Sequence, residues 1–144
     1  MTTIAHNQFP GVVSAIDKGG EHALVTVKAD LITLQALITD HELEKLDLKV
    51  GDAVTAGIRT TDVMFAVEKH HAPISVDNQF EGELVGVERG DVTTRATFKF
   101  ATDDGKELVA VMTNPSADRT EIVKRGHVVA CVKATDITLA IPAA

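Results

Sequence analysis

The sequence Asn7-Gln8-Phe9-Pro10-Gly11 returns 71 residues later as Asn78-Gln79-Phe80-Glu81-Gly82. A second pair of matching stretches follows in the same order: Ile58-Arg59-Thr60-Thr61-Asp62-Val63, then Val132-Lys133-Ala134-Thr135-Asp136-Ile137. A repeat of about 70 residues indicates one folding unit present twice, so a site in one copy is expected to have a counterpart in the other. We divide the chain into repeat 1 (1–68), a linker with the start of repeat 2 (69–77) and repeat 2 (78–144).

Composition limits the kinds of partner. The chain has 144 residues and a formal net charge of −7. We find no basic stripe, which argues against nucleic-acid binding. No apolar run is long enough to span a membrane, and no signal peptide precedes the first repeat, so we expect a cytoplasmic protein. Units of this size bury too little surface to be stable alone, so we expect them to pack on each other or on further copies of the chain.

The pattern of apolar residues predicts a mainly β fold. Each copy combines short strands and Gly-containing turns with one short helix, as expected of two tandem OB-like small β-barrels. Thr39 and Glu42 have the spacing of a helix capping box, and Asn114-Pro115 fits an N-cap followed by proline. The predicted strands span residues 12–16, 22–28, 31–38, 54–58 and 63–67 in the first copy, and 82–88, 93–100, 107–112, 128–133 and 137–141 in the second.

The residues give no indication of an enzyme. No serine lies in a G-x-S-x-G elbow, and no nucleophile and base stand in a recognisable arrangement. The histidines and the single cysteine, Cys131, lack the spacing of a zinc site. Cys131 lies within an apolar strand, where a buried thiol is the expected state. If such an acidic chain binds an anion, it needs backbone N–H groups, hydroxyls and a few well-placed cations.

The Asn-Gln-Phe-x-Gly opening, the Leu48-Lys49-Val50-Gly51-Asp52 turn and the Lys/Arg-x-Thr-Asp close resemble the Mop domain of molbindins. Two such units in tandem are similar to a di-domain molbindin. The resemblance implies non-covalent binding of molybdate or tungstate for storage or buffering, with no organic cofactor. It also implies a homo-oligomer, commonly a trimer, with oxyanions bound between its subunits.

Carried over by position, the resemblance implies two sets of oxyanion ligands, one per copy. They are Ala5, His6, Arg59, Thr60 and Thr61 in the first copy, and Ser75, Val76, Ser116, Lys133, Ala134 and Thr135 in the second. In molbindins the turn before the second strand lies near the threefold axis. This implies a further oxyanion site on backbone N–H groups at Gly19, Gly20 and Gly90.

Four positions depart from the family pattern. Where molbindins have arginine before the Asn-Gln pair, this chain has His6 in one copy and Asp77 in the other. Ile4 replaces the family serine, and Glu42 stands where Ser116 stands in the second copy. These departures keep open an alternative function, an oligomeric interaction or sensor module that has lost or altered its oxyanion binding.

Overall fold

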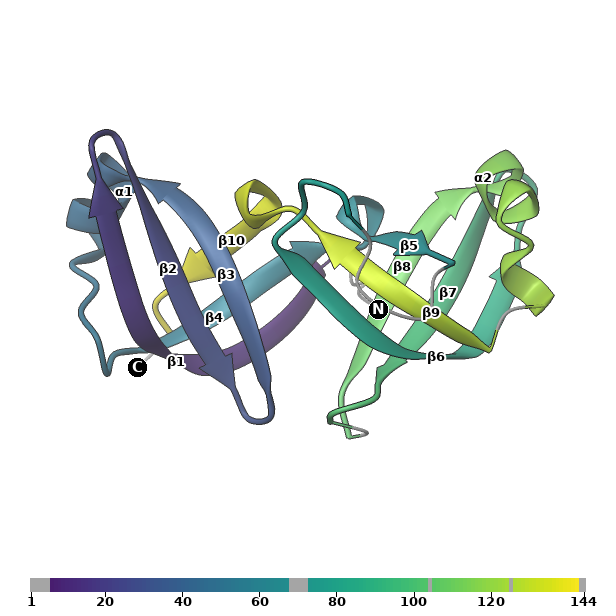
Figure 1. Ribbon diagram of the computed structural model, residues 1–144, viewed down its shortest axis with the longest axis horizontal. Helices are drawn as coiled ribbons and strands as arrows, with labels where there is room; N and C mark the ends of the chain where they lie inside the picture. Colours follow the sequence, from purple (N-terminus) through teal and green to yellow (C-terminus); the bar gives the residue numbers. More distant parts are fainter. Residues whose placement is uncertain (1–5, 68–72, 104, 125, 143–144) are drawn as a thin grey trace.

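The computed structural model describes residues 6–67, 73–103, 105–124 and 126–142. It confirms a mainly β fold with two curled, five-stranded antiparallel sheets that lie side by side (Figure 1). The first sheet has the order β10-β4-β1-β2-β3 and the second β5-β9-β6-β7-β8. We call each sheet with its helix a unit. The first unit comprises β1 (His6–Gly19), β2 (His22–Ala29), β3 (Ile32–Thr39), α1 (Asp40–Leu46), β4 (Ala53–Arg59) and β10 (Ile137–Ala140). The second comprises β5 (Met64–Ala66), β6 (Asn78–Arg89), β7 (Thr93–Phe100), β8 (Glu107–Thr113), α2 (Asn114–Arg119) and β9 (His127–Val132).

The two units exchange their last strands. Strand β5 follows β4 in the sequence but pairs with β9, with Met64 opposite Cys131. Strand β10 follows β9 but pairs with β4, with Ile137 opposite Ile58. Figure 1 shows the yellow β10 lying beside the blue β4, away from the rest of its own repeat. The sequence predicted both strands but counted each within its own repeat, and the exchanged pairing corrects this. Residues 69–72 of the predicted linker lie outside the described residues.

Each exchanged strand is preceded by a short 3₁₀ helix that packs on the other unit. Helix η1 (Thr60–Asp62) contacts β8, and η3 (Ala134–Asp136) contacts β3. A further 3₁₀ helix, η2 (Ile122–Lys124), follows α2 and precedes β9, which is not exchanged. None of the three was predicted, because a single 3₁₀ turn leaves almost no periodic signal in a sequence.

The first strand of each repeat begins earlier than predicted, so that the Asn-Gln-Phe-x-Gly motif lies within β1 and within β6. The motif glycines leave room for a neighbouring strand. A Cβ on Gly11 would come within 2.5 Å of the Lys28 carbonyl oxygen, and one on Gly82 would overlap the Lys99 carbonyl and the Phe98 ring. A side chain at either glycine would therefore push two hydrogen-bonded strands apart.

The motif asparagines join the two units. The Asn78 side chain accepts a hydrogen bond from Gln35 N (2.8 Å) and donates to Gln35 O (2.9 Å) on the edge strand β3. The Asn7 side chain does the same with Val109 on the edge strand β8, at 2.8 Å and 3.0 Å. We call these two pairs the asparagine clamps. Each clamp pairs an edge strand whose backbone N–H and C=O groups would otherwise lack a partner.

All five phenylalanines of the chain form one connected cluster. Phe100 contacts Phe9, Phe80 and Phe98, with ring centroids 5.1 to 5.9 Å apart. Phe65, on the exchanged strand β5, contacts Phe98. Since Phe9 belongs to the first unit and Phe100 to the second, the hydrophobic core is continuous between them.

The helix starts confirm one prediction and correct another. Thr39 and Glu42 form the predicted capping box at α1. At α2 the N-cap is Thr113, whereas the sequence predicted Asn114. Asn114 is instead buried and accepts a hydrogen bond from the Thr94 hydroxyl at 2.7 Å, so its side chain is committed to the interior. Cys131 is buried, as expected.

Candidate functional site

Strand pairing brings the opening and closing motifs of each repeat together. In the first unit His6 lies opposite Arg59, at the end of the β1–β4 ladder. In the second unit Asn78 lies opposite Val132, so Asp77 and Lys133 are the next residues at the same end of the ladder. The register therefore places the predicted ligands of each copy at one end of its sheet. Of His6 only the backbone is described, and Ile4 and Ala5 lie outside the described residues.

The two basic residues of the closing motifs are both exposed. The Arg59 Nε lies 3.6 Å from the Asp62 carboxylate, and the arginine side chain is 62% exposed to solvent. An exposed ion pair of this kind contributes little to stability. The guanidinium therefore retains other N–H donors for an anion.

The closing motifs alternate between buried and exposed side chains. Thr60 and Ala134 are buried, at 7% and 4% exposure. Thr61 and Thr135 are exposed, because the 3₁₀ turn rotates the next side chain outward. Of the two predicted hydroxyls in the first copy, Thr61 is therefore the one that faces solvent.

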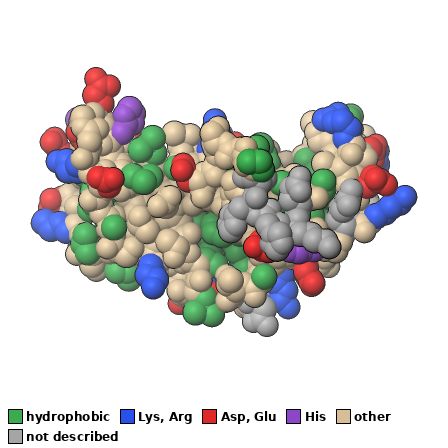
Figure 2. Space-filling model, in the orientation of Figure 1, with side chains coloured by type: hydrophobic (Ala, Val, Ile, Leu, Met, Phe, Trp, Pro, Cys, Tyr) green, Lys and Arg blue, Asp and Glu red, His purple; other side chains and the backbone are tan. Residues whose placement is uncertain are grey.

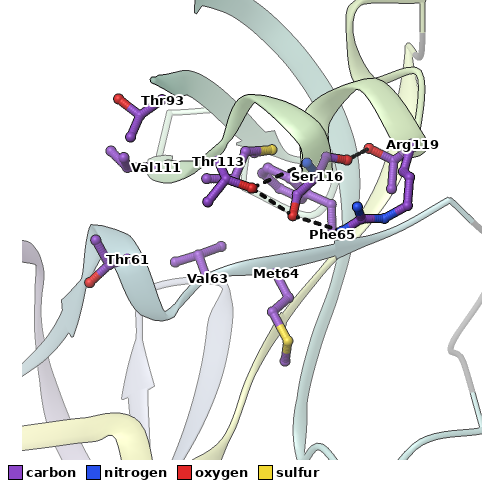
Figure 3. A pocket seen from close by; sticks show the side chains of 11 residues that line it. Thr61, Val63, Met64, Phe65, Thr93, Val111, Thr113, Ser116 and Arg119 are labelled. Carbon is purple, nitrogen blue, oxygen red and sulfur yellow. Dashed lines mark hydrogen bonds between the residues drawn. The ribbon is translucent and has the colours of Figure 1, made fainter. Parts of the chain in front are cut away.

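A pocket of about 550 Å³ lies between the first repeat's closing segment and the second unit (Figure 3). Thr61 and Ser116, which the sequence assigned to different copies, both line it. They meet because the strand exchange carries residues 61–65 onto the second unit. No carboxylate is among the described residues that form its wall. These residues are Thr61, Val63, Met64, Phe65, Thr93, Val111, Met112, Thr113, Ser116, Arg119 and Thr120.

Hydroxyl groups and one arginine form the polar part of this pocket. The Thr113 hydroxyl accepts a hydrogen bond from Ser116 N (3.2 Å) and donates to Ser116 Oγ (3.0 Å). Arg119 Nη2 donates to the same Ser116 Oγ at 3.1 Å. Figure 3 shows the Arg119 side chain folded back toward Ser116, with Thr61 and Val63 on the opposite side of the pocket. Such a group of donors suits an anion.

The equivalent position in the first unit carries its own negative charge. Glu42 Oε1 accepts hydrogen bonds from Thr39 N (3.0 Å) and Thr39 Oγ1 (3.1 Å). The bond from the backbone N–H of Thr39, and then that from its hydroxyl, hold the pKa of the Glu42 carboxyl below its ordinary value. A carboxylate thus lies where the second unit presents the Ser116 hydroxyl.

Of the predicted site residues that the structure describes, only Thr61 and Ser116 line this pocket. Ser75 is exposed, and the Val76 carbonyl accepts a hydrogen bond from Gln79 Nε2 at 3.1 Å. Gly20 has a φ of +66° in the β1–β2 turn, which confirms the expected turn. Gly90 N donates to Thr93 O at 2.8 Å in the matching turn between β6 and β7. The site assignments of Gly19, Gly20 and Gly90 remain predictions.

Charge on the surface agrees with the composition. On the face shown in Figure 2, lysine and arginine side chains are scattered among acidic ones and form no broad basic patch. Within the described residues, no three His, Cys, Asp or Glu side chains group as a metal site would require. No helix in the described part of the chain is long and apolar enough to cross a membrane.

Sequence reasoning missed two features that the structure reveals. Arg119 was not assigned to the site, because it lies outside both repeated motifs and reaches the pocket only by folding back along α2. The asparagine clamps were also missed, although the recurrence of Asn7 and Asn78 was the visible signal.

Three comparisons identify the relatives of this chain. Residues 3–65 match the TOBE domain. Over 142 residues, the chain is 32% identical to the molybdenum transport protein ModE of Herbaspirillum seropedicae and 28% identical to that of Azotobacter vinelandii. It is covered to 98% in each case and spans about half (52%) of the length of these relatives.

Among solved structures, the fold matches the cytoplasmic molybdate-binding protein ModG in its molybdate-bound form. The TM-score is 0.84 at 24% identity, and the match covers 99% of this chain and 100% of that one. The domain match, the sequence relatives and the shared fold together support the resemblance of this chain to tandem Mop/TOBE proteins of the molbindin type.

Proposed function

We propose that this chain binds molybdate or tungstate in the cytoplasm, for storage or buffering, with no catalytic step. In this proposal the oxyanion is held non-covalently between subunits of a homo-oligomer, a trimer, and no organic cofactor, nucleic acid or membrane takes part. The names of the ModE and ModG relatives support the choice of oxyanion.

One observation within the single chain supports the oxyanion part of this proposal, and the place of the site between subunits remains a prediction. Thr61 and Ser116, assigned to the site on sequence resemblance, line a single pocket whose described wall contains an arginine and no carboxylate. The chain as a whole has a net charge of −7, whereas the only charged side chain among the described residues of this pocket is positive. Hydroxyl, N–H and guanidinium donors are the groups that a tetrahedral oxyanion accepts from.

Calorimetric titration with sodium molybdate tests the proposal. We expect the unaltered chain to bind and the Arg59→Ala/Lys133→Ala double variant to bind at least about tenfold more weakly, since a hydrogen bond to a charged group contributes about 1.5–3 kcal/mol. Unchanged affinity in the double variant would reject both residues as ligands. Circular dichroism of the variant checks that its fold is intact.

The assembly can be tested separately. Large apolar side chains are exposed on the single chain, among them Leu31 at 71% and Val92 at 70%. We propose that these side chains take part in contacts between subunits. Light scattering should give a mass near three times the 15.3 kDa of the chain, whereas a mass near 15.3 kDa would contradict binding between subunits.

The second candidate function is an interaction or sensor module without oxyanion storage. It is favoured by the Arg59–Asp62 contact, which partly neutralises one predicted cation, and by Asp77 beside Lys133. Elemental analysis after molybdate soaking and desalting separates the two functions, because only a storage protein retains molybdenum. A pull-down with and without molybdate tests the sensor form of this candidate.

A further inference from the structure

Arg119 differs from Arg59 and Arg89 in its partners. The Arg59 guanidinium lies beside Asp62, and that of Arg89 forms a two-pronged ion pair with Asp118 at 2.7 and 3.2 Å. Arg119 instead donates to a neutral hydroxyl, Ser116 Oγ, and no carboxylate of the described residues lies within 4 Å of it. Its charge is therefore not neutralised by a neighbour, and it faces a pocket.

The Ser116 hydroxyl has one proton left to give. Its oxygen accepts from both Thr113 Oγ1 and Arg119 Nη2. A hydroxyl has two acceptor lone pairs and one donor proton, so both acceptor positions are filled. The remaining polar capacity of this group is as a donor. Ser116 and Arg119 thus present an O–H and several N–H groups side by side. An acceptor with more than one oxygen, such as an oxyanion, can bind these donors together.

The first unit has no equivalent group of donors. By the repeat, Glu42 corresponds to Ser116 and Lys45 to Arg119. The Glu42 carboxylate already takes the N–H and O–H of Thr39, so these donors are occupied by the chain itself. The ionised Glu42 carboxylate repels an oxyanion placed at this position. Oxyanion binding is therefore disfavoured in the first unit.

We propose that Arg119 is a specificity-determining ligand of the oxyanion, and that it confines this mode of binding to the second unit because Glu42 occupies the corresponding place in the first. This inference rests on the proposed function and deepens it by making the two units unequal. A chain with two similar repeats would then offer one arginine–serine site, formed by α2 with the exchanged segment at Thr61.

The experiment compares Arg119→Ala with Lys45→Ala in calorimetric titrations with sodium molybdate at pH 8. Both substitutions remove one positive charge from the last turn of a short helix, so they change the net charge equally. We expect Arg119→Ala to weaken binding about tenfold or more and Lys45→Ala to change it less than twofold. Arg119→Lys, which keeps the charge and loses the planar fork, should fall between Arg119→Ala and the unaltered chain.

The outcomes separate this inference from the proposed function. Molybdate binding by the unaltered chain, together with equal affinities for Arg119→Ala and Lys45→Ala, would overturn the role of Arg119 and leave the proposed function in place. Absence of binding by the unaltered chain would overturn both. Circular dichroism and light scattering on each variant identify a loss of affinity that comes from misfolding or from a changed assembly. In that case Arg119→Lys decides, since equal binding by it and the unaltered chain would contradict a requirement for the guanidinium.

Discussion

Replacement of Asn78 by alanine should destabilise the whole protein, because this side chain joins the two units. Asn78 is 3% exposed, and its side chain makes three hydrogen bonds. Two join it to Gln35 of the other unit, and the third runs to the Val132 carbonyl at 3.1 Å. The substitution removes all three and leaves backbone groups of two strands without these partners.

The structure allows the size of this effect to be worked out. Each hydrogen bond contributes about 0.5–1.5 kcal/mol net, and a buried group left without a partner costs about 1–3 kcal/mol. Gln35 is only half-buried, so water can partly replace the lost bonds there. We therefore expect a loss of about 2–4 kcal/mol in the free energy of unfolding. At about 3–4 °C per kcal/mol for a protein of this size, Tm should fall by roughly 6–16 °C.

Urea unfolding followed by circular dichroism, at one fixed protein concentration, measures the change. Asn7→Ala is the matched variant, and it should cost less, because Asn7 is half-buried while Asn78 is buried. Gln8→Ala is the control, since this neighbouring side chain is exposed. A loss below about 0.5 kcal/mol for Asn78→Ala would show that the asparagine clamps do not hold the units together.

Three further predictions concern charge and packing. Asp77→Arg should strengthen molybdate binding in calorimetry, because a donor fork replaces a repelling carboxylate beside Lys133; equal or weaker binding would show that Asp77 faces away from the anion. Glu42 has a lowered pKa in the folded state, so its charge stabilises the fold above its ordinary value near 4.5, and this contribution is lost as pH falls through the folded pKa. The unaltered chain should therefore exceed Glu42→Gln in free energy of unfolding by less below about pH 4.5 than at neutral pH, as measured by denaturation at several pH values. A difference that stays constant with pH would contradict the role of the Glu42 charge in the capping box. Gly82→Ala should cost at least about 2 kcal/mol in urea unfolding, because its Cβ would overlap a strand carbonyl and a buried ring; a neutral result would mean that β6 and β7 can separate easily.

Local structure was largely predictable from the sequence. The alternation in 22–28 and 93–100 marks two half-buried strands, and both are present as β2 and β7. The capping box of Thr39 and Glu42 was also predicted correctly, because it depends on residues only three positions apart. At α2 the same kind of signal was ambiguous, since Thr113 and Asn114 are both good N-cap residues, and burial of the Asn114 side chain decided the outcome.

The exchange of strands was not predictable in the same way. Strands β5 and β10 are three and four residues long, and their possible partners β4 and β9 come from matching parts of the two repeats. A repeat makes both pairings look alike in sequence, so hydrophobic pattern alone does not choose between them. The site has the same difficulty, because Thr61 and Ser116 meet only as a result of this exchange.

The exchanged strand β10 has a consequence for biosynthesis. The first unit needs residues 137–140 to complete its sheet, and these follow all the other described strands in the sequence. During translation, its four earlier strands leave the ribosome long before the fifth, and the outer edge of β4 waits for β10. Neither unit can therefore mature as an independent domain, and we expect the nascent chain to complete both sheets in one late step, after β10 has been synthesised.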